Sequence, residues 1–185
     1  TVTRAIRESL HAMGYIEVET PVLQLIHGGA TARPFGTHLN AFDIPMTMRI
    51  ALELYLKRAM VGGADRVYEI GRIFRNEGID SSHSAEFTML EAYQSWGDQR
   101  TIAEMTQRII VDAADALGRR QFDSADGEID LDGEWTWLAV YDAVSDVVGE
   151  EITPDTPRET LLKHLDAREV VYNPALSDGK LVMEL

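Results

Sequence analysis

The sequence predicts an α+β fold in which an antiparallel β-sheet is flanked by helices. Two strand patterns, Arg66 to about Arg75 and Glu86 to Gln94, follow each other with only a loop between them, as antiparallel strands do. Apolar residues at three- and four-residue spacings predict amphipathic helices over residues 1–13, 50–60 and 98–117. With 185 residues, 45% of them hydrophobic and 26% charged, the composition is that of a soluble globular domain.

The remaining elements of the first half follow from local patterns. Gly14 stands where the first helix needs its C-cap, and Tyr15 to Glu19 alternates as a strand does. Gly28-Gly29-Ala30 predicts a sharp turn, and the polar residues 31–40 predict a loop.

To the second half we assign no chemistry. Asp98 is expected to cap the helix that runs to about Leu117. Residues 121–132 are acidic and rich in turn formers, and residues 135–140 have the composition of a strand. A helix is expected after Pro157, and a last helical pattern runs to the end of the chain.

Charge and composition restrict the possible functions. The net charge is −14, from 17 basic and 31 acidic residues, whereas a surface that grips nucleic-acid phosphates needs clusters of Lys and Arg. The absence of cysteine excludes disulfides and thiolate metal sites. The N-terminus shows no secretory signal pattern, and no apolar run approaches the ~20 residues of a membrane span. We therefore expect a cytoplasmic protein without a membrane segment.

The second strand presents an unusual face. Because strand side chains alternate, one face carries Phe87, Met89, Glu91 and Tyr93. Arg75, at the far end of the partner strand, offers a fork that suits phosphate oxygens, and a nearby phenylalanine can stack on a base. The acid and the phenol further along suit a cationic amine. The residues alone thus indicate one site that holds a nucleotide and an ammonium compound side by side.

This stretch resembles motif 2 of the class II aminoacyl-tRNA synthetases, in the form found in lysyl-tRNA synthetases. The resemblance is carried by Phe74-Arg75-Asn76-Glu77-Gly78, His83, Glu86-Phe87-Thr88 and Glu91-x-Tyr93. Aspartyl and asparaginyl enzymes share parts of this motif, but residues 28–44 (GGATARPFGTHLNAFDI) and 49–58 (RIALELYLKR) look lysyl-specific. Residues 1–21 look like motif 1, the family's dimerisation element.

The resemblance implies a partial class II catalytic domain over residues 1–185, with motif 2 at residues 66–94. An anticodon-binding domain is expected before Thr1 and motif 3 after Leu185, because both ends of the chain fall inside helical patterns. The implied reaction is ATP-dependent activation of L-lysine to lysyl-adenylate and its transfer to tRNA(Lys). Mg²⁺ is expected with ATP, its protein ligands lying outside this chain, and tRNA is expected to bind mainly elsewhere. Motif 1 implies a homodimer.

The resemblance also implies the ATP-binding residues Arg75, Glu77, His83 and Phe87. Arg75 would be the catalytic residue, bridging the α-phosphate and the lysine carboxylate. Phe87 would stack on adenine, Glu77 would lie on the ATP side and His83 would contact the γ-phosphate. Without the resemblance, a strand phenylalanine is more often core and a loop histidine is usually solvated.

The implied lysine-binding residues are Gly29, Glu53, Glu91 and Tyr93. Glu91 would hold the α-ammonium, Glu53 and Tyr93 would hold the ε-ammonium, and the loop at Gly29 would supply a carbonyl to the α-amino group. By themselves, a glycine pair usually only turns the chain and a lone helical acid is usually exposed to solvent.

Departures from the family pattern leave alternatives open. Leu52 and Ala85 stand where the family usually has proline, whose loss is expected to loosen the placement of Glu53 and of the motif 2 loop. One alternative is a paralogue that activates lysine or an analogue for another acceptor. Another is a non-catalytic domain kept for dimerisation or ligand sensing. An aspartyl-type ligase is disfavoured, because the acids and the phenol suit a cation.

Overall fold

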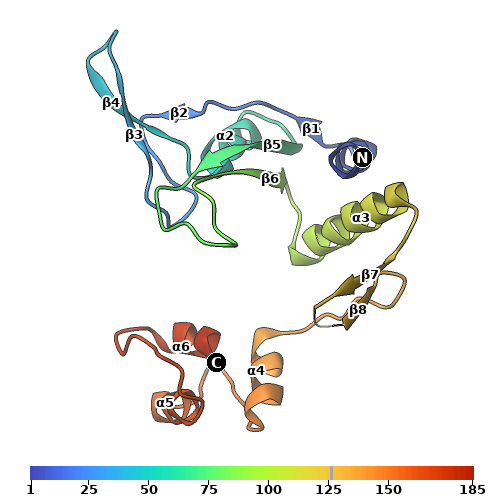
Figure 1. Ribbon diagram of the computed structural model, residues 1–185, viewed down its shortest axis with the longest axis vertical. Coiled ribbons are helices and arrows are strands. Elements are labelled where there is room, and N and C mark those ends of the chain that lie inside the picture. The colour runs from blue at the N-terminus through green and yellow to red at the C-terminus, as the bar shows by residue number, and fades with distance from the viewer. Residues whose placement is uncertain (126) are drawn as a thin grey trace. The chain divides into compact units, whose positions relative to one another are not determined.

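The computed structural model describes residues 1–125 and 127–185, and the chain divides into two compact units, Thr1–Asp130 and Leu131–Leu185. Helices and strands of the first unit are α1 Val2–Ala12, β1 Ile16–Glu17, β2 Leu23–Gln24, β3 Gly36–Leu39, β4 Ile44–Met48, α2 Glu53–Val61, β5 Arg66–Phe74, β6 Glu86–Gln94, α3 Gln99–Leu117, β7 Gln121–Ser124 and β8 Gly127–Asp130 (Figure 1). The α+β class predicted from the sequence is confirmed.

The main sheet of the first unit has the strand order β1-β5-β6. β5 and β6 form the predicted antiparallel pair, in a register that runs from Arg66 opposite Gln94 to Phe74 opposite Glu86. β1 adds to β5 in parallel through a two-residue pairing. The bounds of β5 and β6 agree with the sequence prediction, because both strands are rich in branched and aromatic residues.

Helices cover both faces of this sheet. On one face, α1 and α3 pack over a cluster that includes Leu10, Tyr68 and Ile109. On the other face, α2 packs over a cluster built on Leu52, Leu56, Val67 and Ile73, with side chains of β6 against it. The face of β6 that carries Phe87 and Tyr93 therefore also packs against this hydrophobic core.

Several predicted helix ends are confirmed. The Asp98 side chain accepts the Thr101 N–H over 2.9 Å and forms a reciprocal capping box at the start of α3. Gly118 ends α3 with φ +74°, and Gly14 follows α1 with φ +82°, values that glycine adopts without steric cost.

Two segments expected to lack regular structure form strands instead. The polar range 31–40 contains β3, which pairs with β4 in a second sheet of order β2-β4-β3. The acidic range 121–132 contains the β7–β8 hairpin. In both, turn-forming residues mark the hairpin and its flanks, and cross-strand pairing overrides the weak local preference.

The second unit contains α4 Val140–Val148, α5 Arg158–Ala167 and α6 Asp178–Glu184 around a core of Ile152, Leu161, Leu165, Leu181 and Val182. The expected strand over residues 135–140 is wrong: residues 135–139 have no regular structure and Val140 begins α4. A strand needs a partner edge, and the described elements of this unit are all helices. Of the helices in the described residues, none has the length and apolarity to cross a membrane.

Candidate functional site

The loop between β5 and β6 borders a cavity of about 600 Å³. Its lining includes all four residues predicted to bind ATP, namely Arg75, Glu77, His83 and Phe87. Phe87 reaches it from the second position of β6, opposite Ile73 in the strand register, and the other three come from the connecting residues. The hairpin thus gathers residues that are up to 12 positions apart around one space.

Arg75 is held at the wall of this cavity by three contacts. Its backbone N–H donates to the Ala85 carbonyl over 2.9 Å, which closes the base of the loop. Its Nε donates to the Ile50 carbonyl over 3.3 Å. Its guanidinium carbon lies 5.3 Å from the centre of the Phe87 ring, within the range of a cation–π interaction. A fixed cation beside an aromatic plate suits a phosphorylated nucleotide.

The loop itself is organised by Asp80, a residue that sequence reasoning missed. Its carboxylate accepts the N–H groups of Ser82 and His83, each over 2.8 Å, and lies 2.9 Å from His83 Nδ1. The Ser82 N–H, together with the side chains of His83 and Ser82, lowers the pKa of Asp80. The detectable signal was an aspartate two residues before a serine in a loop. Because Nδ1 faces Asp80, the His83 ring would meet a ligand through Nε2.

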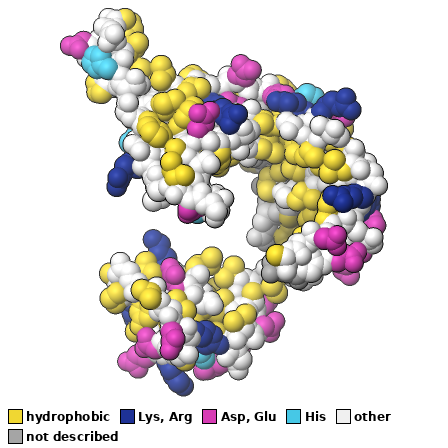
Figure 2. All heavy atoms as spheres, viewed as in Figure 1, with side chains coloured by type: hydrophobic (Ala, Val, Ile, Leu, Met, Phe, Trp, Pro, Cys, Tyr) yellow, Lys and Arg dark blue, Asp and Glu magenta, His cyan; other side chains and the backbone are white. Residues whose placement is uncertain are grey.

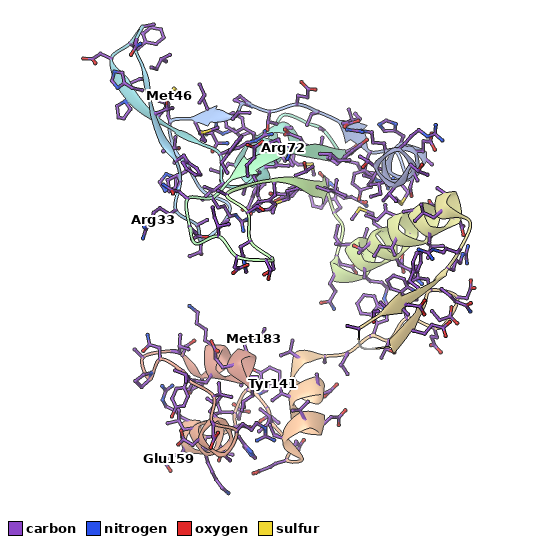
Figure 3. The ribbon with its side chains drawn as sticks, in the orientation of Figure 1. Arg33, Met46, Arg72, Tyr141, Glu159 and Met183 are labelled. Carbon is purple, nitrogen blue, oxygen red and sulfur yellow. The ribbon has the colours of Figure 1, made fainter. Side chains whose placement is uncertain are left out.

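A second loop supports the other side of the motif. The Asn76 N–H donates to the carbonyl of Arg33 over 2.7 Å. Figure 3 labels Arg33 on the segment that leads into β3. This hydrogen bond joins the polar segment that follows the Gly28-Gly29 turn directly to the β5–β6 loop.

Further along β6, Glu91 and Tyr93 contact each other on the face that Phe87 shares. The Tyr93 hydroxyl donates to Glu91 Oε2 over 2.9 Å. Burial, the hydrogen bond to Glu91 and its charge raise the pKa of Tyr93, so the phenol stays protonated and remains a donor. The other oxygen, Glu91 Oε1, accepts the backbone N–H of Leu52 over 2.8 Å.

Glu53 lies at the start of α2 and is about one-third exposed, rather than fully solvated. Its Oε1 is 2.7 Å from the ammonium of Lys57, one turn along the helix. That ammonium is also 6.0 Å from the centre of the Tyr93 ring. An alkylammonium group thus already contacts Glu53 and approaches Tyr93, two of the residues predicted to bind the lysine side chain.

Gly29 packs directly against Glu53. Its φ is +86°, and a Cβ placed there would lie 2.8 Å from the Cβ of Glu53 and 3.1 Å from that of Ala51. Both the backbone conformation and the lack of space require glycine at this position. The structure therefore brings Gly29, Glu53, Glu91 and Tyr93 to one region, while their roles in binding lysine stay predictions.

The start of α2 differs from the sequence prediction. The helix begins at Glu53 rather than Ile50, and the preceding residues Ile50, Ala51 and Leu52 are buried in a lead-in without regular structure. Leu52 places its side chain in the core and its N–H on Glu91. Proline has no N–H, so the residue that departs from the family pattern supplies a contact that proline lacks.

Within residues 1–125 and 127–185, no group of three or more His, Cys, Asp or Glu side chains could hold a metal ion. On the face displayed in Figure 2, Lys and Arg side chains are scattered among acidic and apolar ones.

Comparison with known proteins places these features in a family. The sequence model of class II tRNA synthetases (D, K and N) matches residues 1–175. Two relatives named lysine–tRNA ligase, from Kineococcus radiotolerans and Mycolicibacterium gilvum, are each 52% identical over the whole of this chain. A protein of Mycobacterium avium named lysylphosphatidylglycerol biosynthesis bifunctional protein LysX is 49% identical over the whole chain, which covers 16% of that protein. The chain spans 37% and 38% of the two ligases.

Proposed function

We propose a function from the premise that this chain belongs to the class II tRNA synthetases of the D, K and N group. The chain carries the ATP and L-lysine subsites of a lysine–tRNA ligase, which forms lysyl-adenylate and transfers the lysyl group to tRNA(Lys). The observation that carries the proposal is the shared face of β6. Phe87 borders the cavity beside Arg75 at one end of that face, and Glu91 with Tyr93 forms an anionic, hydrogen-bonded pair at the other.

In the proposed reaction, a carboxylate oxygen of lysine attacks the α-phosphorus of ATP, the α–β phosphoanhydride bond breaks and pyrophosphate leaves. The protein supplies position and charge rather than a nucleophile. Arg75 neutralises the negative charge that grows on the α-phosphate oxygens, while Phe87 stacks on adenine. Glu77 and His83 contact the nucleotide from the loop. Mg²⁺ accompanies ATP and shields its phosphate charge, and we assign it no ligand among the described residues.

Selectivity for lysine follows from the anionic side chains. Glu91 binds the α-ammonium, and Glu53 with Tyr93 binds the ε-ammonium. A neutral substrate would bring no cation to Glu53 or Glu91 to offset their desolvation, whereas a carboxylate substrate would be repelled. The contact of Glu53 with the Lys57 ammonium supports this assignment, because the same chemical group is accepted there within the chain.

Amino-acid-dependent ATP–pyrophosphate exchange tests the proposal, on this chain and on the full gene product that contains it. Lysine, aspartate and asparagine are compared, and Arg75→Ala is the control. We expect exchange with lysine alone, reduced about 10³-fold by Arg75→Ala. Exchange with aspartate or asparagine, or silence from the full gene product, would refute the proposed reaction. Silence from both proteins would favour a non-catalytic domain kept for dimerisation or sensing.

A second candidate is activation of lysine or an analogue for an acceptor other than tRNA. Two observations favour it: the net charge of −14, and the similarity to the mycobacterial protein named for lysylphosphatidylglycerol biosynthesis. Both candidates use the same adenylate chemistry, so exchange does not separate them. The two candidates are separated by measuring whether the full gene product transfers radioactive lysine to tRNA or to phosphatidylglycerol vesicles.

The remaining assignments follow from the same premise. We propose that tRNA binds mainly through regions outside this chain and that the reaction takes place in the cytoplasm. We also propose that residues 1–21 contribute to a homodimer interface. Ile16 is 59% exposed, and the next segment exposes further apolar side chains at Leu23, Leu25 and Ile26, which a second subunit would cover.

A further inference from the structure

A buried ion pair outside the proposed substrate subsites joins three segments of the first unit. Arg49 and Glu69 are each 3% exposed, and Arg49 Nη1 donates to Glu69 Oε1 over 2.7 Å. Arg49 also donates to the carbonyls of Thr20 and Arg72, over 3.0 and 2.7 Å. The other oxygen of Glu69 accepts both the hydroxyl and the N–H of Thr20. The pair thereby ties the segment that follows β1 to the end of β4 and to β5.

The segment that begins at Arg49 contacts both proposed subsites. The carbonyl of Ile50 accepts Arg75 Nε over 3.3 Å, and the N–H of Leu52 donates to Glu91 Oε1 over 2.8 Å. These are backbone groups, so their positions depend on where Arg49 anchors the chain. A displacement of this segment would therefore move the hydrogen-bond partners of the Arg75 guanidinium and of the Glu91 carboxylate together.

Glu69 also affects Glu91 through its charge. The two residues are directly opposite each other in the β5–β6 ladder, so their side chains leave the same face of the sheet. Like charges at such positions repel each other. Because Arg49 neutralises Glu69, the repulsion between the two carboxylates is reduced where Glu91 is to accept an ammonium ligand.

Gly71 shows how closely the pair is enclosed. A Cβ at this strand position would overlap Arg49 Nη2 and would lie 2.9 Å from Glu69 Oε1. The guanidinium has little room to yield, since its Nε and Nη1 are held by hydrogen bonds. An alanine at position 71 would therefore displace the pair without removing either charge.

We propose that Arg49 and Glu69 are positioning residues that set the geometry of the phosphate-binding and ammonium-binding groups at once. This inference rests on the proposed function, because the groups that the pair positions are those assigned to ATP and lysine. Arg49 acts through Ile50 and Leu52 on both subsites, and Glu69 holds Arg49 in place.

The test uses the full gene product and the double variant Arg49→Met/Glu69→Met. Replacing both members of the pair leaves no unpaired buried charge, so the double variant is expected to be milder than either single replacement, and its melting temperature separates lost stability from lost positioning. The measurements are the melting temperature and the KM values for lysine and for ATP in pyrophosphate exchange. Arg120→Gln is the matched control, because its 2.6 Å pair with Asp115 lies at the surface of α3. Gly71→Ala is a second variant that keeps both charges.

We expect the double variant to melt at a lower temperature than the wild type, because the backbone groups of Thr20 and Arg72 lose hydrogen-bond partners, while both KM values rise about tenfold. A merely structural role would lower the amount of active enzyme and leave both KM values unchanged, and that result would overturn the inference. If the double variant does not fold, Gly71→Ala decides: the same paired rise supports positioning, and unchanged KM values exclude it. A wild-type protein without lysine-dependent exchange would instead defeat the proposed function, so the two failures are distinguishable.

Discussion

Tyr93→Phe is the sharpest single test of the ammonium subsite, because it deletes one hydroxyl and keeps the ring. In the wild type this hydroxyl donates to Glu91 Oε2 over 2.9 Å. That hydrogen bond orients the phenol oxygen toward the proposed ε-ammonium, and a hydrogen bond from a charged group contributes about 1.5–3 kcal/mol. Tyr93 is only partly buried and Glu91 retains the N–H of Leu52, so the lower end of that range applies. We therefore expect the KM for lysine to rise about tenfold.

The assay is lysine-dependent pyrophosphate exchange by the full gene product, with both substrates varied. The KM for ATP should not change, because Tyr93 is not among the residues that line the cavity at the β5–β6 loop. The raised pKa of Tyr93 keeps the phenol protonated, so the ratio of variant to wild-type KM should stay constant between roughly pH 6 and 9.

Tyr15→Phe is the matched control. Its hydroxyl also donates over 2.9 Å, to Gln94 Oε1, but Tyr15 belongs to the cluster beneath α1 and α3 on the opposite face of the sheet. This variant should lose about 1 kcal/mol of unfolding free energy and keep the wild-type KM for lysine. An unchanged KM in Tyr93→Phe, or an equal rise in Tyr15→Phe, would refute the reasoning.

Three further changes have defined outcomes. Lys57→Gln removes the ammonium that contacts Glu53, so the KM for lysine in exchange should fall about twofold; a rise would mean that Lys57 assists binding. Phe87→Leu removes a stacking surface, so the KM for ATP should rise about fivefold to tenfold with the KM for lysine unchanged. Asp98→Ala removes the cap of α3 and should lower the melting temperature by a few degrees at neutral pH. Hydrogen bonds from the Thr101 N–H and hydroxyl lower the pKa of Asp98, so this contribution is present above the ordinary carboxyl pKa of 3.8 and is lost as pH falls through the lower folded value. Melting curves of Asp98→Ala and wild type should accordingly converge below about pH 3, and a difference that persists there would contradict the assignment.

Local pattern was sufficient for the elements that frame the site. The clustering of branched and aromatic residues predicted β5 and β6 with bounds close to those observed, and Asp98 predicted the start of α3. Period-two alternation predicted one face for Phe87, Glu91 and Tyr93, and β6 has that face. These features depend on neighbours in the sequence, so the sequence contains them directly.

Local sequence patterns gave wrong secondary-structure predictions where a strand depended on pairing with a segment elsewhere in the chain. Residues 135–139 have strand-like composition, but the described part of their unit provides no strand to pair with. β3 forms inside a polar segment because β4 pairs with it. A strand is stabilised by its neighbours more than by its own composition, and those neighbours are chosen by the fold.

The sequence by itself determined the residue types of the site and the strand face that Phe87, Glu91 and Tyr93 share. Only the tertiary structure decided how they are held: the amide of Leu52 on Glu91, the ammonium of Lys57 on Glu53 and the carboxylate of Asp80 on His83. It also revealed the Arg49–Glu69 pair, whose members lie 20 positions apart and share no motif. The physical reason is that hydrogen bonds and ion pairs require distances of about 3 Å, and chain folding, not sequence spacing, brings such groups together.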